Sequence, residues 1–327
     1  AGKKASCLVN PRACRESEIQ YLPARRKKKI AVVGAGPAGL SCAVTAAGRG
    51  HRVTLYEKST EIGGQFNMAR KIPGKEEFEE TLRYFRKQLE ITGVSVKSGH
   101  ECGSRELLQE NFDEIVIATG VRPRIPAIPG NDHPKTLLYT DVLLGGKDVG
   151  KKVTIVGAGG IGFDMAAYLS HDPESSAPEP ELFFRQWGID PEMRRRGGLA
   201  EKGPEDIPSP RQICLLQRKD EKPGKRLGKT TGWIHRLCLE RKKVQMISGA
   251  EYVKIDDQGL HIRRKGKAEI IEADHVIICA GQEERRELWD ELKKKHRNLH
   301  LIGGADRAGE LDAKRAVAQG CFLGGRL

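Results

Sequence analysis

Two glycine-rich segments of one type, each directly behind a short run of β-branched residues, restrict the possible folds of this chain most strongly. The first reads Lys29-Ile-Ala-Val-Val-Gly-Ala-Gly-Pro-Ala-Gly39, and the second reads Lys152-Val-Thr-Ile-Val-Gly-Ala-Gly-Gly-Ile-Gly162. In a strand–turn–helix unit the first Gly permits a tight turn, the second lets the backbone approach a diphosphate, and the third lets the helix pack on the strand. The diphosphate then lies at the positive end of the helix. One such segment is weak evidence, whereas two predict that the chain holds two dinucleotides.

The composition fits two globular domains. The chain has 327 residues, including 38 Gly, and no run of about 18 apolar residues, so we predict no membrane span. Its formal net charge is +13, but the basic residues are scattered and aromatics make up only 5%. We therefore expect no nucleic-acid binding and ascribe the charge to attraction of small phosphate-bearing molecules. The first residues lack an apolar leader and an initiator Met, which predicts an internal start in a processed or excised piece. Eight cysteines without a leader indicate a reducing compartment, the cytoplasm or a eukaryotic mitochondrion.

The order of elements predicts an α/β fold in which one dinucleotide domain is inserted into another. The expected elements are, in chain order, strand 29–33, helix 37–49, strand 53–57, helix 75–92, strand 114–120, a Pro-rich crossover 121–134, strand 152–156, a helix to about 170, strand 212–219, strands near 250–263, strand 273–281, strand 300–306 and helix 310–320. The expected domains are an extended segment 1–23, a first domain at 24–128 and 276–327, and a second at 129–275. A polar insertion at 171–210 is expected to be a functional flap or partly disordered.

The residue that ends the second strand of each unit separates the two dinucleotides. Glu57 ends the first pair, where a carboxylate binds a ribose hydroxyl of FAD or NAD. Arg218 and Lys219 end the other pair, where cations favour the 2′-phosphate of NADPH. The alternative for Arg218 and Lys219 is that they are ordinary exposed charges and the second site takes NADH.

Further residues point to FAD at the first site. Asp306 is expected at a strand end, where its carboxylate can accept from a ribityl hydroxyl or, alternatively, cap the next helix. That helix start, at 310–312, can direct N–H groups at the flavin pyrimidine oxygen. The expected FAD contacts are Gly34, Gly36, Pro37, Ala38, Gly39, Glu57, Gly64, Gln65, Ala118, Thr119, Gly120, Asp306, Leu311 and Asp312. The expected NADPH contacts are Gly157, Gly159, Gly160, Ile161, Arg218 and Lys219, and Gly281 is a further expected cofactor contact, assigned to neither dinucleotide.

A basic loop at 222–235 has two open interpretations. Lys225, Arg226 and Lys229 can clamp the NADPH phosphates, with Trp233 or His235 beside the nicotinamide, or the loop is simply a solvated charged segment. Histidines elsewhere show no metal-ligand spacing, and we interpret them as structural or exposed. These are His51, His100, His261, His275 and His296.

The chain resembles the flavin-reductase superfamily of glutathione and thioredoxin reductases, trimethylamine dehydrogenase and adrenodoxin reductase. The resemblance is closest to the bacterial-type NADPH-dependent 2,4-dienoyl-CoA reductase family and covers nearly the whole chain. The segments that carry it are Cys7-Leu-Val-Asn-Pro-Arg-Ala-Cys14, Glu61-Ile-Gly-Gly-Gln-Phe-Asn67, Lys71-Ile-Pro-Gly-Lys-Glu-Glu-Phe78, Leu216-Gln-Arg-Lys219, Lys229-Thr-Thr-Gly-Trp-Ile-His-Arg236, Cys279-Ala-Gly-Gln282 and Glu310-Leu-Asp-Ala313. It implies a glutathione-reductase-like FAD domain with an inserted NADPH domain. It also implies hydride transfer from NADPH to FAD, then electron transfer through a 4Fe-4S cluster to FMN in an N-terminal barrel that reduces dienoyl-CoA in the β-oxidation of unsaturated fatty acids.

The chain departs from that family because it lacks the barrel, the FMN site and three clustered cysteines. Cys7 alone matches a cluster ligand, and one thiolate cannot hold a four-iron cluster. No Cys-x-x-Cys or Cys-x4-Cys occurs, which disfavours a disulfide reductase. The resemblance therefore implies an electron-input module whose partner is the missing barrel. The alternatives are a stand-alone NADPH:acceptor flavin reductase serving an iron–sulfur partner, and a non-catalytic FAD or nucleotide-binding module.

Overall fold

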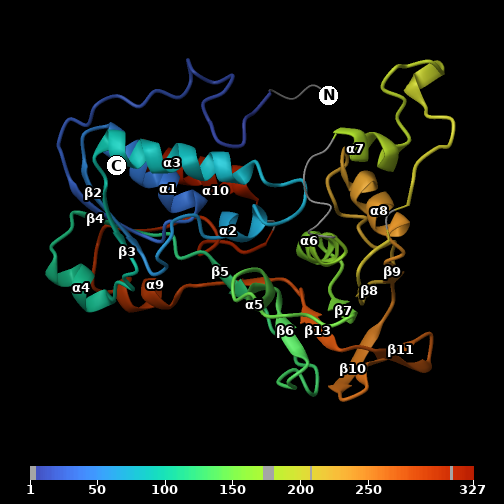
Figure 1. Cartoon of the computed structure of the whole chain (residues 1–327). Coiled ribbons are helices and arrows are strands. Elements are labelled where there is room, and N and C mark those ends of the chain that lie inside the picture. The colour runs from blue at the N-terminus through green and yellow to red at the C-terminus, as the bar shows by residue number, and fades with distance from the viewer. Residues whose placement is uncertain (1–4, 172–179, 207, 310–311) are drawn as a thin grey trace. The chain divides into compact units, whose positions relative to one another are not determined.

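The computed structural model describes residues 5–171, 180–206, 208–309 and 312–327. The chain forms two compact units (Figure 1). Unit 1 comprises Ala1–Arg70, Lys75–Arg122 and Gln282–Leu327, and unit 2 comprises Lys71–Gly74 and Pro123–Gly281. These units differ from the predicted domains in four places. The N-terminal segment joins unit 1, Lys71–Gly74 joins unit 2, and the boundaries between the units lie at 122/123 and 281/282 rather than at 128/129 and 275/276.

Unit 1 is built on a five-stranded parallel sheet in the order β15-β4-β1-β2-β3. Its strands are β1 (Lys29–Val33), β2 (Arg52–Glu57), β3 (Ser95–Ser98), β4 (Glu114–Ile117) and β15 (Leu299–Leu301). The central strand β1 is buried from Ile30 to Val33, as expected for a parallel strand covered on both faces. A short ribbon of β5 (Val121–Pro123) and β14 (Gln282–Glu284) is separate from this sheet.

Helices cover both faces of the unit 1 sheet. Alternate residues of β1 point to opposite sides, so each face contributes apolar side chains to its own core. Ile30 and Val32 face a core shared with α1, α3 and α10, and Ala31 and Val33 face one shared with α4 and α9. Figure 1 shows α1, α3 and α10 gathered together. The bounds are α1 (Pro37–Gly48), α2 (Phe66–Ala69), α3 (Phe78–Thr92), α4 (Ser104–Gln109), α9 (Glu287–Leu292) and α10 (Ala313–Gly324).

Unit 2 contains a second parallel sheet in the order β6-β13-β7-β8-β9. Its strands are β6 (Thr136–Leu138), β7 (Lys152–Val156), β8 (Gln212–Leu216), β9 (Gln245–Ile247) and β13 (His275–Ile278). An antiparallel sheet packs its Leu260 and Ile262 against Val276 and Ile278 of β13. The strands of that sheet are β10 (Glu251–Asp256), β11 (Gly259–Arg264) and β12 (Lys267–Glu272). The helices of unit 2 are α5 (Tyr139–Leu143), α6 (Gly160–Leu169), α7 (Pro180–Trp187) and α8 (Gly232–Arg241).

Two parallel sheets, each with its own glycine-rich turn, confirm the predicted α/β class. Several element boundaries were predicted wrongly. Strand β8 ends at Leu216 rather than 219, and β15 ends at Leu301, so that Asp306 lies in the following turn rather than at a strand end. The insertion expected to be a flap or partly disordered contains α7, and its residues 172–179 lie outside the described part. In the described chain, no helix combines the length and apolar character needed to cross a membrane.

Candidate dinucleotide-binding sites

The turn between β1 and α1 leaves no room for side chains. Gly34 adopts φ +106°, and a Cβ on it would lie 2.4 Å from the carbonyl oxygen of Ala118. A Cβ on Gly39 would lie 1.8 Å from the carbonyl oxygen of Gly34, so the helix packs directly on the turn. As described from Pro37 to Gly48, α1 has no side-chain cap and no acidic residue in its first turn. Its N–H groups at Ala38 and beyond therefore suit an anionic group.

Glu57 ends β2 beside this turn and is 9% exposed. Its Oε2 accepts a hydrogen bond from the Ala35 N–H at 2.8 Å, and its Oε1 accepts from the Ser59 N–H at 2.9 Å. A carboxylate oxygen can accept more than one hydrogen bond, so Glu57 keeps capacity for a hydroxyl donor. The structure therefore brings Glu57 and the first glycine turn together.

A second glycine pair packs against the first turn. The Gly63 N–H donates to the carbonyl oxygen of Ala35 at 2.8 Å. A Cβ on Gly64, which has φ +53°, would lie 3.0 Å from the Gly36 Cα. The next residue, Gln65, is the N-cap position of α2, and its Oε1 accepts from Gln282 Nε2 at 3.2 Å.

The turn after β4 completes the same edge of the sheet. The Ala118 N–H donates to the carbonyl oxygen of Val33 at 2.8 Å, next to Gly34. Thr119 Oγ1 donates to the carbonyl oxygen of Arg285 at 2.7 Å, and the Arg285 N–H donates back to Gly120 at 3.1 Å. Arg285 is a positioning contact that the sequence did not single out, because it is distant in the chain and lies in no motif.

The hydrogen bonds of Asp306 and Asp312 differ from those that the sequence predicted. Asp312 is the N-cap of α10, and its carboxylate accepts from the Arg315 N–H at 2.6 Å. Asp306 Oδ2 instead accepts from Gln319 Nε2 at 2.8 Å. The capping role that the sequence left open for Asp306 is thus performed by Asp312. Leu311 lies outside the described residues.

Cys7 lies in an N-terminal segment that runs along α10. Lys314 Nζ donates to Ser6 Oγ at 2.6 Å, and the Tyr21 hydroxyl is 2.8 Å from Cys321 Sγ. Cys7 and Cys14 are exposed and free. Within the described residues, no group of three metal-ligating side chains includes either of them.

The turn between β7 and α6 repeats the geometry of the first. A Cβ on Gly157, which has φ +112°, would lie 2.3 Å from the carbonyl oxygen of Cys279, and one on Gly162 would lie 1.8 Å from that of Gly157. Gly159 and Gly160 are exposed, and a Cβ on either meets no atom within 4 Å. The half-buried Ile161 follows them in the first turn of the helix. The open face of this turn is therefore at Gly159 and Gly160.

The residues after β13 and β8 flank the second turn. Gly281 has φ +104° and its carbonyl accepts from the Arg124 N–H at 3.0 Å. Arg218 and Lys219 are exposed, and no carboxylate in the described chain pairs with either. Gln217 Nε2 donates to the carbonyl oxygen of Lys219 at 3.1 Å, which fixes the backbone that carries the two cations.

The basic loop at 222–235 packs against the second turn's helix. A Cβ on Gly224 would lie 2.6 Å from the ring of Phe163, which is in α6. Lys225 and Arg226 pair with Glu221 at 3.6 and 3.4 Å. Lys229 is exposed and has no carboxylate partner in the described part of the loop, and Trp233 is 56% exposed.

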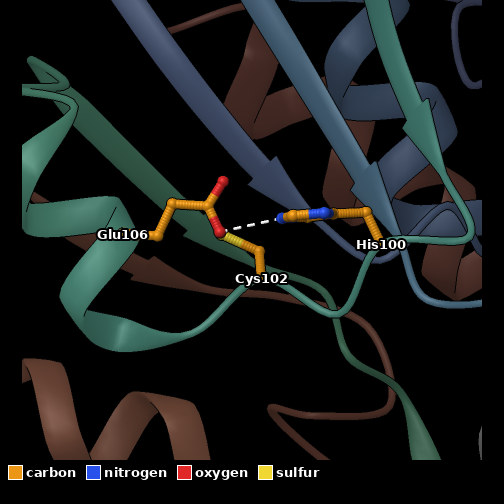
Figure 2. Close-up of side chains that lie close together, drawn as sticks. All are labelled: His100, Cys102 and Glu106. Carbon is orange, nitrogen blue, oxygen red and sulfur yellow. Dashed lines mark hydrogen bonds and ion pairs between the residues drawn. The ribbon is translucent and has the colours of Figure 1, made fainter.

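One further group of reactive side chains lies in unit 1, in the loop after β3. His100, Cys102 and Glu106 converge after β3 (Figure 2), although no metal-ligand spacing was expected for His100 from the sequence. The pattern His-x-Cys-x3-Glu matches no familiar motif, and only the folded loop brings the three together.

Comparisons with known proteins agree with this architecture. Residues 28–305 match the family described as pyridine nucleotide-disulphide oxidoreductase. A metal reductase of Desulforamulus reducens is 32% identical over 311 residues, which are 93% of this chain and 45% of the relative. The structure of a 2-naphthoyl-CoA reductase complex matches with a TM-score of 0.82 and 28% identity, over 98% of this chain and 43% of that chain.

A smaller structure shares the fold alone. The thioredoxin reductase of Lactococcus lactis matches with a TM-score of 0.63 and 17% identity, over 92% of this chain and 97% of that one. These likenesses confirm the predicted pair of Rossmann-like domains of the glutathione-reductase type. The chain spans less than half the length of the metal reductase and of the 2-naphthoyl-CoA reductase chain.

Proposed function

The chain belongs to the pyridine nucleotide-disulphide oxidoreductase family, and from that premise we propose that it is the electron-input module of a larger reductase. In this proposal the module takes reducing equivalents from NADPH onto FAD and passes them to a separate acceptor site. The observation that carries the proposal is the opposite charge beside the two glycine turns. Glu57 lies at the first turn, and Arg218 and Lys219 follow the strand next to the second.

The residues of unit 1 fit FAD. Gly34 and Gly39 permit the tight turn and the close packing of α1, and a Cβ on Gly36 would meet nothing nearer than the Gly64 Cα at 4.0 Å, so a diphosphate can approach the backbone there. Gly36, Pro37 and Ala38 would place their backbone at that diphosphate, and Glu57 would accept from the adenosine ribose. Gly64, Gln65, Ala118, Thr119, Gly120, Asp306, Leu311 and Asp312 remain our proposed contacts to the rest of the cofactor.

The residues of unit 2 fit NADPH for the same steric reason. Gly157, Gly159, Gly160 and Ile161 would carry its diphosphate, and Gly281 would lie beside it. Arg218 and Lys219 would bind the 2′-phosphate, supported by their exposure and by the absence of a competing carboxylate in the described chain. Lys229 is a better phosphate contact than Lys225 or Arg226, because Glu221 already pairs with those two.

When bound, FAD accepts a hydride from NADPH and releases electrons singly or in pairs. The protein's part is to hold the reacting rings in contact, so we assign no general acid or base. The sequence has no redox-active cysteine pair, and Gln65, Phe66 and Asn67 follow the Gly63–Gly64 pair instead. The electrons must therefore leave for an acceptor other than a dithiol.

We propose that this acceptor is a 4Fe-4S cluster, to which Cys7 contributes one thiolate in a full-length protein, followed by FMN in a barrel domain. The resemblance to 2,4-dienoyl-CoA reductases supports a dienoyl-CoA as the final substrate. The names of the two large relatives, a metal reductase and a 2-naphthoyl-CoA reductase, differ in the acceptor. Such variety is expected if the acceptor is chosen outside the portion that this chain matches.

Anaerobic titration with NADPH tests the proposal. The purified chain should carry FAD, and NADPH should bleach the flavin absorbance in a stoichiometric titration. A flavin that stays oxidised would refute the electron-input proposal and favour a nucleotide-binding module without catalysis.

The charge assignment has its own test. Arg218→Ala should raise the KM for NADPH about tenfold or more without changing the KM for NADH, because a charge-assisted phosphate contact is worth about 1.5–3 kcal/mol. Lys267→Ala, an exposed lysine on β12, serves as the control and should change neither. Equal effects of Arg218→Ala on both nucleotides would remove the support for a 2′-phosphate site.

A further inference from the structure

The loop after β3 and the start of α4 bring three different metal-ligating groups together. His100 Nε2 donates to Glu106 Oε2 at 2.8 Å, and Cys102 Sγ lies beside them. The three donor atoms all lie within 4.8 Å of one another. Figure 2 shows the side chains converging from one short stretch of chain, with the Cys102 sulfur next to the Glu106 carboxylate.

The donor set matches one class of ion. A neutral imidazole nitrogen, a thiolate and a carboxylate oxygen are the ligands of Zn²⁺ in proteins. Bond lengths of about 2.0–2.3 Å place neighbouring ligands of a tetrahedral ion roughly 3.5 Å apart. His100 Nε2 and Glu106 Oε2 are already closer than that, and the Cys102 sulfur lies within 4.8 Å of both. The side chains of His100 and Glu106 are 45% and 32% exposed, which leaves an entry path for an ion.

The charges of the cluster favour a divalent cation over a bare thiolate. Glu106 places a carboxylate beside the Cys102 sulfur, and its negative charge disfavours a bare thiolate there. A bound divalent ion removes this repulsion, because its positive charge lies next to both the Cys102 thiolate and the Glu106 carboxylate. Lys97 is a positive group near the cluster, but it is exposed and lies over the Tyr56 ring at 5.0 Å, free to turn outward. Glu110 also faces the group and adds negative charge.

We propose that His100 Nε2, Cys102 Sγ and Glu106 Oε2 bind one Zn²⁺ ion, with water at the fourth position. Binding releases the Cys102 thiol proton to solvent, and the neutral His100 ring changes tautomer, so that its proton lies on Nδ1 and Nε2 is free for the metal. The hydrogen bond between His100 and Glu106 is replaced by two bonds to the metal. No electron transfer is involved.

The same loop is tied to the FAD-side edge of the sheet. The His100 N–H donates to the carbonyl oxygen of Glu57 at 2.9 Å, and the Gly99 N–H donates to that of Ser59 at 2.8 Å. An ion that fixes this loop therefore also stabilises the backbone around Glu57. This gives the site a stability readout that is independent of activity.

Zinc binding to the full chain, measured by equilibrium dialysis and elemental analysis, tests the site. The exposed thiols are first removed in a Cys7→Ser/Cys14→Ser background. This background should bind one Zn²⁺ per chain, and Cys102→Ser or His100→Gln should weaken the binding about 100-fold or more, since even outer partners of a ligand are worth 10–100-fold. A background that binds no zinc at micromolar concentrations, or a Cys102→Ser variant that keeps it, overturns the proposal.

His261→Gln is the matched control. His261 also pairs with a carboxylate, since its Nε2 lies 2.8 Å from Asp256 Oδ2, but among the described residues this pair belongs to no group of three metal-ligating side chains. It should leave zinc binding unchanged. Zn²⁺ should also raise the Tm of the background but not that of His100→Gln. If Cys102→Ser fails to fold, the exposed His100→Gln variant alone decides, and an unchanged zinc affinity there refutes the site.

Discussion

Replacing Gly162 by Ala is a direct test of how the second glycine turn is built. The new Cβ would lie 1.8 Å from the carbonyl oxygen of Gly157 and 3.3 Å from Leu215 Cδ1. Non-bonded carbon and oxygen atoms do not approach below about 3 Å, so α6 must move away from β7 by roughly 1 Å in a closely packed interior. Gly160→Ala, two residues earlier in the same helix, meets no atom within 4 Å.

The two substitutions should therefore change the stability in different directions. Overpacking at Gly162 costs about 3 kcal/mol, offset by about 1 kcal/mol of helix propensity gained from Ala, which leaves a net loss of about 2 kcal/mol. For a domain of about 150–250 residues this corresponds to a Tm lower by roughly 4–8 °C. Gly160→Ala gains propensity without a clash, and its Tm should be unchanged or slightly higher.

Calorimetry of both variants beside the wild type measures the difference, and NADPH affinity is measured on the same samples. Gly160→Ala should weaken NADPH binding through the crowded diphosphate approach while keeping the Tm. A Gly162→Ala variant as stable as Gly160→Ala would refute the close contact between α6 and the turn. Equal destabilisation by both would show that the cost comes from losing glycine rather than from the clash.

Two further substitutions test single contacts. Glu57→Gln should weaken FAD retention about tenfold or more, because the amide leaves one N–H of Ala35 or Ser59 without its charged acceptor. The fluorescence of released flavin measures this retention, and unchanged retention would contradict the role of Glu57. Burial raises the pKa of Glu114, but hydrogen bonds from Lys28 at 2.7 Å and His300 at 2.8 Å outweigh it and hold the pKa below the ordinary value of 4.5. A depressed folded-state pKa stabilises the fold above pH 4.5, and the gain is lost as pH falls through the lowered value. Wild type should therefore exceed Glu114→Gln in urea stability at pH 7, and the gap should narrow below pH 4.5; a gap independent of pH would contradict the charged network.

The glycine turns were predictable because their requirement is local. Gly34 and Gly157 adopt a positive φ, and Gly39 and Gly162 lie against the glycine five residues earlier, so the pattern identifies both turns and their strands and helices. The α/β class followed from the order of the strands and helices around these turns. Contacts between segments that are distant in the chain could not be predicted in this way. The hydrogen bond from Thr119 to the carbonyl oxygen of Arg285 is an example.

The cluster around Cys102 shows why some site residues escape a reading of the sequence. His100, Cys102 and Glu106 meet because the chain turns sharply between β3 and α4, and this path depends on tertiary packing of Cys102 and Leu107 in the core beneath. The cap at Asp312 was missed for a similar reason. Asp306 and Asp312 are both plausible caps by type, and only the helix start at Ala313 separates them.

The division of unit 1 along the chain has a consequence for synthesis on the ribosome. Helix α10 covers α1 so closely that a Cβ on Gly320 would lie 2.0 Å from the carbonyl oxygen of Ala38. That cover follows all of unit 2 in the chain and is made after it. At about 5–20 residues per second, the nascent chain exposes the apolar face of α1 for several seconds after unit 2 has left the ribosome. Unit 1, whose first strand emerges early, is thus completed only after all of unit 2 has been made, and nascent-chain quality control would meet it before any cofactor could.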